Sequence, residues 1–224
     1  MLNSSIGDAQ HHYNAWMRGS ASYSFNQNFS TNLELQYRMQ NGFGNENICD
    51  KQLMQSARLW LNYQPSKQLL VAFSPFAVFK HSRIIQRPED EKAKPIGEYR
   101  TTTMLKFQKE LDKKLVLTTS TKAEYRTFDN QVKDILRLRQ LVGLSYRIND
   151  KVEAIVSDEV FVNVLGVSSI HFFDQNRIML QFAFTPKPKW KLEAGYIHIN
   201  RMLSSTVDIL EDENFFVNLN YKIR

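Results

Sequence analysis

The sequence is poor in cysteine and has no long apolar run. Its one cysteine, Cys49, has no partner for an internal disulfide, and no cysteine or histidine spacing suits a metal site. No stretch of roughly 18 apolar residues exists, which excludes a transmembrane helix. A glycine-rich phosphate-binding loop is also missing. The sequence therefore gives no reason to expect a bound metal, a cofactor or a catalytic site.

Positive charge is in mild excess but is not clustered. The 224 residues include 29 Lys and Arg against 23 Asp and Glu, for a net charge of +6. A nucleic-acid-binding surface needs its basic residues gathered together. Here they are spread singly among apolar neighbours, so we expect no nucleic-acid partner. The negative mean hydropathy does not argue against a membrane barrel, because only every second residue of its strands faces lipid.

Apolar and polar residues alternate most clearly at the C-terminal end. Phe215, Val217, Leu219, Tyr221 and Ile223 share one side of an extended segment, and mostly polar residues share the other. This period of two recurs from residue 15 onward and predicts eleven strands. They cover residues 15–25, 29–39, 53–64, 68–80, 98–109, 114–126, 136–148, 152–164, 171–185, 189–200 and 213–223. Such lengths suit a tilted membrane crossing of about 9–11 residues, whereas strands of soluble proteins are typically nearer 5–6.

The connections between these strands alternate in length. Short turns fall at residues 26–28, 65–67, 111–113, 149–151 and 186–188. Longer loops fall at residues 41–52, 81–97, 127–133, 165–170 and 202–213. Short turns on one rim and long loops on the other are typical of bacterial outer-membrane barrels. We therefore predict an all-β fold, a single antiparallel transmembrane barrel of about 10–12 strands with a polar, charged lumen.

Aromatic residues indicate which face meets lipid. They gather beside the short turns on the apolar side of the strands, as an interfacial girdle does. The predicted girdle consists of Tyr23, Phe25, Phe29, Tyr63, Phe107, Tyr146, Phe184, Trp190 and Tyr221. An apolar interior would also be hard to fill in a barrel this wide, since side chains just fill the interior at about eight strands. Both arguments place the apolar face outside.

Charged residues concentrate on the opposite, inward face. The predicted lumen charge network consists of Arg18, Glu34, Arg38, Arg58, Glu98, Arg100, Glu124, Arg126, Arg137, Arg139, Glu153, Glu159, Arg177 and Glu193. Lys80, Lys106, Lys122 and Lys191 share this side. Buried charges are costly unless paired, so one interpretation is a self-neutralising ladder that packs a small lumen. The other is a cation-rich pore or pocket that favours a small anionic solute.

An ordered set of short motifs resembles a known family. Phe173-Asp174-Gln175-Asn176-Arg177 followed by Leu192-Glu193-Ala194-Gly195-Tyr196 is the most telling pair. The others are Trp16, Glu98-Tyr99-Arg100, Ala123-Glu124-Tyr125-Arg126, Arg137-Leu138-Arg139 and Asp158-Glu159-Val160-Phe161-Val162-Asn163. Together, over residues 13–224, they resemble the bacterial family called domain of unknown function 2490. The resemblance implies an uncharacterised outer-membrane barrel of Bacteroidetes-type, Gram-negative bacteria with no established activity. The ending Tyr221-Lys222-Ile223-Arg224 departs from the terminal aromatic that is usual in such barrels.

The N-terminal end raises two questions. Residues 1–13 are expected to precede the barrel domain, which covers residues 14–224. Residues 6–10 look like the tail of a signal peptide cut after Ala9, and we expect the natural reading frame to begin upstream of Met1. Eleven strands also conflict with the even number usual in bacterial barrels. A strand within residues 4–13, a false assignment or an N-terminal segment in the lumen would each account for the odd count.

Three functional hypotheses follow. The first is an outer-membrane component embedded in the lipid bilayer, either a narrow pore or an accessory subunit bound to other envelope proteins. The second is a lipid-modifying enzyme, for which His198 has the outward parity and Ser204 and Ser205 follow in a loop, although their spacing matches no known triad. The third is a soluble β-barrel that binds an apolar ligand. The non-enzymatic first hypothesis fits the sequence best.

Overall fold

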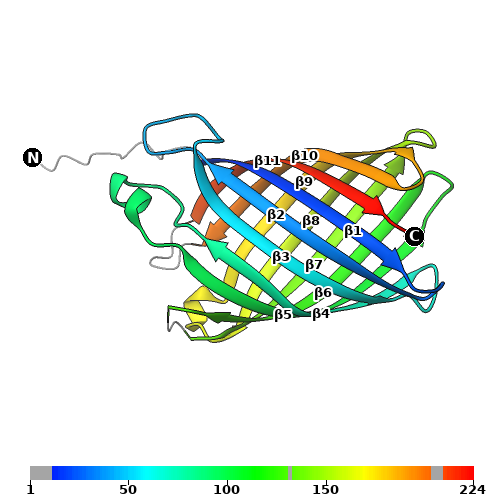
Figure 1. Cartoon of the computed structure of the whole chain (residues 1–224), viewed down its shortest axis with the longest axis horizontal. Helices are drawn as coiled ribbons and strands as arrows, with labels where there is room; N and C mark the ends of the chain where they lie inside the picture. Colours follow the sequence, from blue (N-terminus) through cyan, green and yellow to red (C-terminus); the bar gives the residue numbers. More distant parts are fainter. Residues whose placement is uncertain (1–11, 131–132, 203–208) are drawn as a thin grey trace, which may run out of the picture.

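The protein folds as one closed β-barrel (Figure 1). The computed structural model describes residues 12–130, 133–202 and 209–224. These residues form eleven strands, all of which the alternation pattern located. The strands are β1 (His12–Ser24), β2 (Phe29–Gln40), β3 (Lys51–Tyr63), β4 (Leu69–His81), β5 (Ile96–Glu110), β6 (Leu115–Phe128), β7 (Ile135–Arg147), β8 (Val152–Leu165), β9 (Phe173–Lys187), β10 (Trp190–Met202) and β11 (Ile209–Lys222). The predicted all-β barrel is confirmed.

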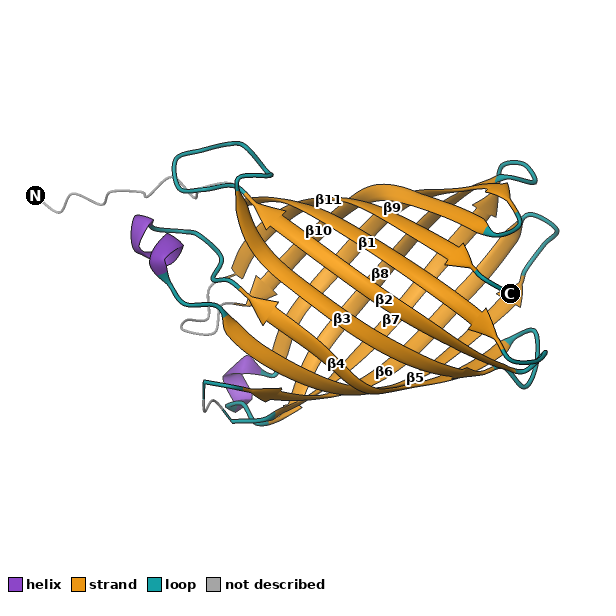
Figure 2. Cartoon of the chain, viewed as in Figure 1, coloured by secondary structure: helices purple, strands orange, loops and turns teal. Residues whose placement is uncertain are grey.

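Two short 3-10 turns, η1 (Pro88–Lys92) and η2 (Ser169–His171), lie in long loops (Figure 2). Within the described residues, no helix is long and apolar enough to cross a membrane, a criterion that does not apply to strands. The two rims differ as predicted: the five short turns lie at one end of the barrel and the long loops, as far as they are described, at the other (Figure 1). Asn26 shapes one short turn, because its side chain accepts hydrogen bonds from the backbone N–H groups of Asn28 and Phe29.

The odd strand number is accommodated by one parallel pair. Neighbouring strands are antiparallel around the barrel, except that β1 and β11 pair in parallel, from His12 opposite Asp212 to Ser22 opposite Lys222. An odd number of strands that alternate in direction must bring two strands of the same direction together at closure. None of the eleven predicted strands is false. Of the predicted N-terminal segment, residues 12–13 belong to β1 and residues 1–11 lie outside the part that the structure describes.

Polar side chains connect the parallel seam on its inner side. His12 Nδ1 lies 2.8 Å from Asp212 Oδ1, and Asn14 Nδ2 donates to Asn214 Oδ1 at 2.9 Å. Farther along, the Ser20 hydroxyl donates to Asn220 at 2.7 Å. Parallel strand pairs are slightly less stable per residue than antiparallel ones. These side-chain bonds therefore reinforce the weaker type of pairing at the place where the barrel closes.

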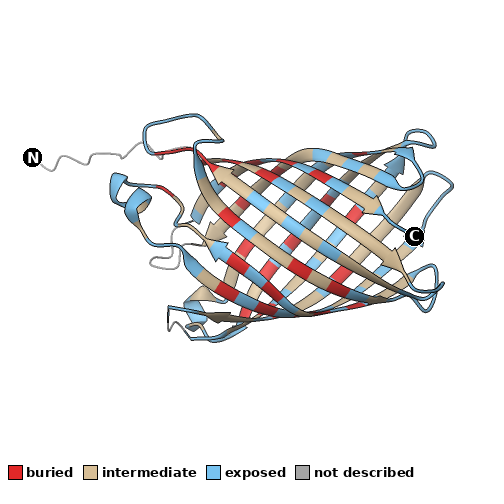
Figure 3. Cartoon of the chain, in the orientation of Figure 1, coloured by how far each residue is buried: buried red, intermediate tan, exposed pale blue. Residues whose placement is uncertain are grey.

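Buried and exposed residues alternate along the strands (Figure 3). The outer face is apolar, as Leu35 and Phe182 illustrate, with exposed fractions of 55% and 61%. The inner face is polar and charged. One β-bulge breaks the alternation in β4, where the register shifts between Ser74 and Ala77. It turns Phe79 inward and leaves Lys80 exposed, so the prediction that Lys80 faces the lumen is wrong.

Candidate functional site

A cavity of about 1100 Å³ occupies the half of the lumen nearest the long loops. Its mouth is formed by loop residues such as Arg83, Arg87 and Ser168. Its deepest lining residues include Leu141 and Gln181, which lie near the middle of their strands, and Trp60, which lies toward the short-turn end of β3. All eleven strands project side chains into this one space, which the rolled sheet alone brings together.

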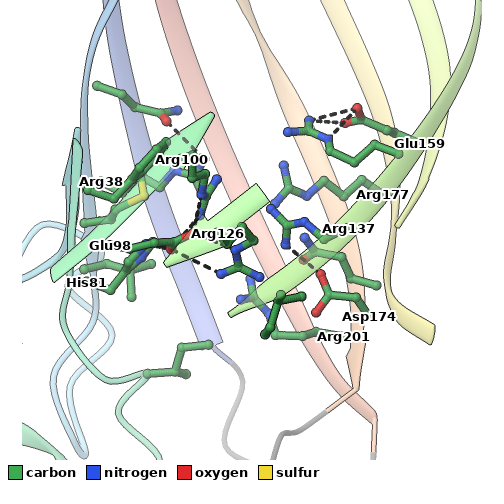
Figure 4. A pocket seen from close by; sticks show the side chains of 18 of the residues that line it. Arg38, His81, Glu98, Arg100, Arg126, Arg137, Glu159, Asp174, Arg177 and Arg201 are labelled. Carbon is green, nitrogen blue, oxygen red and sulfur yellow. Dashed lines mark hydrogen bonds and ion pairs between the residues drawn. The ribbon is translucent and has the colours of Figure 1, made fainter. Parts of the chain in front are cut away.

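Glu98 of β5 is the centre of one charged cluster. It accepts hydrogen bonds from Arg100, whose Nη2 lies 2.9 Å from its Oε2, and from Arg126, whose Nε lies 2.6 Å from its Oε1. His81 Nε2 approaches the same carboxylate to 2.8 Å. The Glu98 side chain is 1% exposed, so its charge depends on these partners, which Figure 4 shows on one side of the pocket. A buried carboxylate can keep its negative charge when it is paired with cations in this way.

Glu124 of β6 is the centre of a second cluster. It is directly opposite Arg137 of β7 in the sheet, and Arg137 Nη2 donates to it at 2.6 Å. Arg139 Nη1 donates at 2.8 Å to the other carboxylate oxygen, and Arg58 lies 3.7 Å away. Arg139 also binds Glu159 of β8 at 2.8 Å. One fully buried carboxylate thus joins three guanidinium groups and links strands that are not neighbours.

A bulge adds Asp174 to this cluster. Phe161 of β8 pairs with Gln175 and Val162 pairs with Phe173, so Asp174 is the extra residue between them. Its carboxylate accepts a hydrogen bond from Arg137 Nη1 at 2.8 Å and lines the cavity. Simple alternation from the inward-facing Arg177 would place Asp174 on the outer face, but the inserted residue reverses that facing. Asn176 does face outward, where it donates to Asp158.

Inward aromatic rings support the guanidinium groups. Phe161, which is fully buried, has Arg139 and Arg177 each 4.4 Å from its ring centroid. Arg100 lies 3.8 Å from the ring centroid of Phe79. Arg38 lies 3.5 Å from the ring centroid of Trp16. Arginine stacks well on aromatic faces because its planar cation is weakly hydrated. The rings therefore hold arginines in place where carboxylates are too few.

The remaining predicted lumen residues lie in two further groups. Arg18 is 3.5 Å from Glu34 and 3.6 Å from Glu193, near the middle of the barrel. Glu153 lies near the short-turn rim. There the Lys191 ammonium lies 3.7 Å from the carboxylate of Glu153 and 3.3 Å from that of Glu193. Neither Glu153 nor Lys191 lines the cavity, which distinguishes this rim from the arginine-lined half.

The predicted girdle residues lie on the outer wall next to the short turns. Phe29 stacks on Tyr63 with ring centroids 4.8 Å apart, and Trp190 packs against Tyr221 at 4.4 Å. His198 is also on the outer face, where its Nδ1 lies 3.1 Å from Glu213 Oε1. Ser204 and Ser205 lie outside the described residues, and Cys49 is exposed in a loop. No group of three metal-binding side chains occurs in the described ranges.

Several site residues were missed at the sequence level. Trp16, Trp60 and Phe161 share the parity of Arg18, Arg58 and Glu159, so alternation alone could have placed them inside. A second set, Arg201 and Asp212, lies in the last residues of β10 and the first of β11, beyond the predicted strand ends. Their ion pair, at 3.2 Å, adds a further arginine to the cavity wall.

Basic side chains outnumber acidic ones in this cavity. Its described lining has twelve arginine and lysine side chains against five carboxylates. Adding Glu124, Glu193 and Asp212, which pair with lining residues, raises the carboxylates to eight and still leaves four more cations than anions. Among the described residues of this half of the lumen, cations therefore outnumber carboxylates.

The fold and this cavity define a closed β-barrel with a polar, arginine-lined lumen. The chain belongs to the family described as "Protein of unknown function (DUF2490)", whose model matches residues 13–209, and the family resemblance is thereby confirmed. None of the curated proteins matches it.

Two of the solved structures that the chain resembles are porins by their titles. "NanC porin structure in rhombohedral crystal form" has 9% identity and a TM-score of 0.54, over 94% of this chain and 98% of that one. "Anion-selective porin from Comamonas acidovorans" has 10% identity and a TM-score of 0.37, over 85% of this chain and 52% of that one. At such identities, the first likeness concerns the fold alone, and the second carries no argument.

Proposed function

We propose that this protein is a bacterial outer-membrane barrel whose lumen is a narrow pore favouring small anionic solutes. The excess of cations lining the cavity is the observation that carries the proposal. Rings of arginine and lysine in a pore select anions, because the wall replaces part of the hydration that the anion loses. The cavity extends to loop residues such as Arg83, Arg87 and Ser168, where solutes would reach these charges.

The apolar outer wall supports a membrane location. Exposed apolar patches on soluble monomers rarely exceed a few hundred Å², whereas here large apolar side chains are exposed all around the barrel. Aromatic residues beside the short turns suit a membrane–water interface. A porin shares the fold over nearly its full length, and the family resemblance favours a Gram-negative, Bacteroidetes-type source.

Cell fractionation tests the location. We expect recovery with the outer membrane, extraction only by detergent, and a band whose gel mobility changes on heating. Recovery in the soluble fraction without detergent would contradict the proposal and favour a soluble barrel that binds an apolar ligand.

Planar-bilayer recording tests the pore. Under a KCl gradient, we expect stepwise conductance. The reversal potential should be displaced toward the equilibrium potential of chloride. Lys122 lines the cavity, so Lys122→Gln should weaken the anion preference. Its partner Glu159 would still be paired with Arg139 in this variant. Lys67→Gln, in a short turn, is the matched control and should leave the anion preference unchanged. A flat trace from correctly folded protein would exclude the pore and favour an accessory subunit of an envelope complex.

Catalysis is not part of this proposal. His198 and Glu213 lie together on the outer face, so the lipid-modifying alternative has a definite test. Purified protein and His198→Ala should show equally negligible phospholipid hydrolysis in mixed micelles. Turnover by the native protein that the variant loses would favour the enzyme instead.

A further inference from the structure

Among the arginines that the strands carry into the cavity, two differ from the others in their partners. Arg58, Arg100, Arg126, Arg137, Arg139 and Arg201 each have a carboxylate within 4.0 Å. Arg38 of β2 and Arg177 of β9 have none among the described residues. Arg38 donates to the neutral side chain of Gln36 at 3.1 Å. Arg177 rests against aromatic rings. Both side chains line the cavity.

Both of these guanidinium groups lie against one indole ring. Arg38 is directly opposite Trp16 in the sheet, and its guanidinium carbon is 3.5 Å from the ring centroid. The guanidinium carbon of Arg177 is 5.3 Å from the same centroid. Arg177 is on β9, which is separated from β1 by the β10–β11 hairpin. Trp16 is only 6% exposed and packs against Ile197, Ile199 and Phe216. One indole ring therefore contacts two like charges, although like charges repel.

Hydrogen-bonding groups around Trp16 also lack partners. The Nε1–H of Trp16 and the Nε–H groups of Arg38 and Arg177 are buried without an acceptor among the described residues. Most buried polar groups in proteins are hydrogen-bonded, so a cluster of unpaired donors calls for an explanation.

We propose that Arg38, Arg177 and Trp16 form a binding site for a small oxyanion, a carboxylate or a phosphate. The inference rests on the proposed function to the extent that solutes must enter the lumen. An oxyanion accepts two parallel hydrogen bonds from one guanidinium fork, a geometry that chloride cannot use. It would balance the charge of the two cations that have no carboxylate within 4.0 Å and that both line the cavity. The site would therefore select oxyanions over chloride, beyond a general preference for negative charge.

Trp16 provides a direct optical signal. The three tryptophans are Trp16, Trp60 and Trp190, so a Trp60→Phe, Trp190→Phe variant in detergent leaves Trp16 as the only indole. Inorganic phosphate and acetate are titrated separately at constant ionic strength, with chloride as the balancing anion. We expect a saturable change in emission with at least one oxyanion, and the stronger of the two identifies the recognised group. A linear response, or the same response to chloride alone, would overturn the proposal.

Substitutions then locate the site. In the single-indole background, Arg38→Gln and Arg177→Gln should each raise the apparent Kd at least about tenfold, as expected for a lost hydrogen bond to a charged group. Arg38→Lys keeps the charge but not the fork and should restore only part of the affinity. The matched control is Arg147→Gln, because Arg147 lies at the short-turn end of β7 and outside the cavity. An equal loss of affinity in the control would indicate a general charge effect and overturn the site.

A second measurement protects against poorly folding variants. In the unmodified protein, the temperature at which the gel band shifts should rise with phosphate or acetate at constant ionic strength, since a ligand stabilises the state that binds it. The double variant Arg38→Gln, Arg177→Gln should show no such rise. A rise that persists in this variant would contradict the site. Neither assay requires conduction. Oxyanion binding together with a flat bilayer trace would thus refute the pore but support the site. Conduction without oxyanion binding would support the pore and refute the site.

Discussion

Glu124 and Arg137 are direct cross-strand partners on β6 and β7, with Glu124 Oε2 only 2.6 Å from Arg137 Nη2. The same carboxylate binds Arg139 at 2.8 Å and is fully buried. The single negative charge of Glu124 therefore pairs with both Arg137 and Arg139, in a part of the wall where cations outnumber carboxylates.

Replacing Glu124 with Gln should be severely destabilising. It leaves Arg137 and Arg139 with less compensation in a buried setting, and breaking a buried ion pair typically costs about 3–5 kcal/mol. Urea unfolding in detergent micelles, followed by gel mobility, measures the change. Glu153→Gln is the control, because its pair with Lys191 is half-exposed and weak, worth about 1 kcal/mol at most. Equal losses in the two variants would contradict the central role of Glu124.

The parallel β1–β11 seam can be tested by cross-linking. Gly19 and Leu219 are paired in register on the outer face, and a side chain added at Gly19 meets no atom within 4 Å. In a Cys49→Ser background, Gly19→Cys with Leu219→Cys should form a disulfide on mild oxidation. Gly19→Cys with Phe215→Cys should not, since four residues of strand displace the sulfurs by about 13 Å. Cross-linking of the second pair alone would mean a different register or closure.

Membrane insertion predicts a depth-dependent cost for charge on the outer wall. Leu35 is near the middle of β2 and 55% exposed. Leu35→Arg should lower the free energy of unfolding in lipid vesicles by about 2–4 kcal/mol. Leu111→Arg, in a short turn, is the same chemical change at the rim and should cost about 1 kcal/mol or less. If both substitutions were equally mild, the outer wall would not face lipid.

The long loop between β4 and β5 should tolerate mild acid. Burial tends to raise the pKa of Asp90, but hydrogen bonds from the N–H groups of Gln86 and Arg87 and from Arg83 outweigh it and set the pKa below its usual value. The stabilising contribution is therefore complete above the unfolded-chain pKa of about 3.9 and is lost as the pH falls through the lower folded value. Carboxyl NMR titration of Asp90 should give a midpoint below about 3.9.

An Asp90→Asn variant checks the same contacts at neutral pH. Without the charged acceptor, the loop should open more often, and trypsin should cleave faster after Arg83. Cleavage after Lys67, in a short turn, is the internal control and should not change. An unaltered rate at Arg83 would show that the Asp90 contacts do not hold the loop.

Much of this architecture could be predicted locally. Alternation assigned Arg137 and Glu124 to the inner face and Leu219 and Tyr221 to the outer one, because a strand presents successive side chains to opposite sides. The turn-forming residues likewise separated the short rim from the long-loop rim. Simple alternation fails where one inserted residue changes the facing, at Lys80 and Asp174, since a bulge depends on pairing with another strand.

The sequence by itself determined the eleven strands, their two faces and the charged character of the lumen, since each depends on residues close together in the chain. Only the tertiary structure decided that β1 and β11 close the barrel in parallel, that Glu98 and Glu124 each bind several arginines, and that Arg38 and Arg177 share Trp16 without a carboxylate. These outcomes depend on strand register and barrel curvature, which are properties of the closed sheet and not of any single segment.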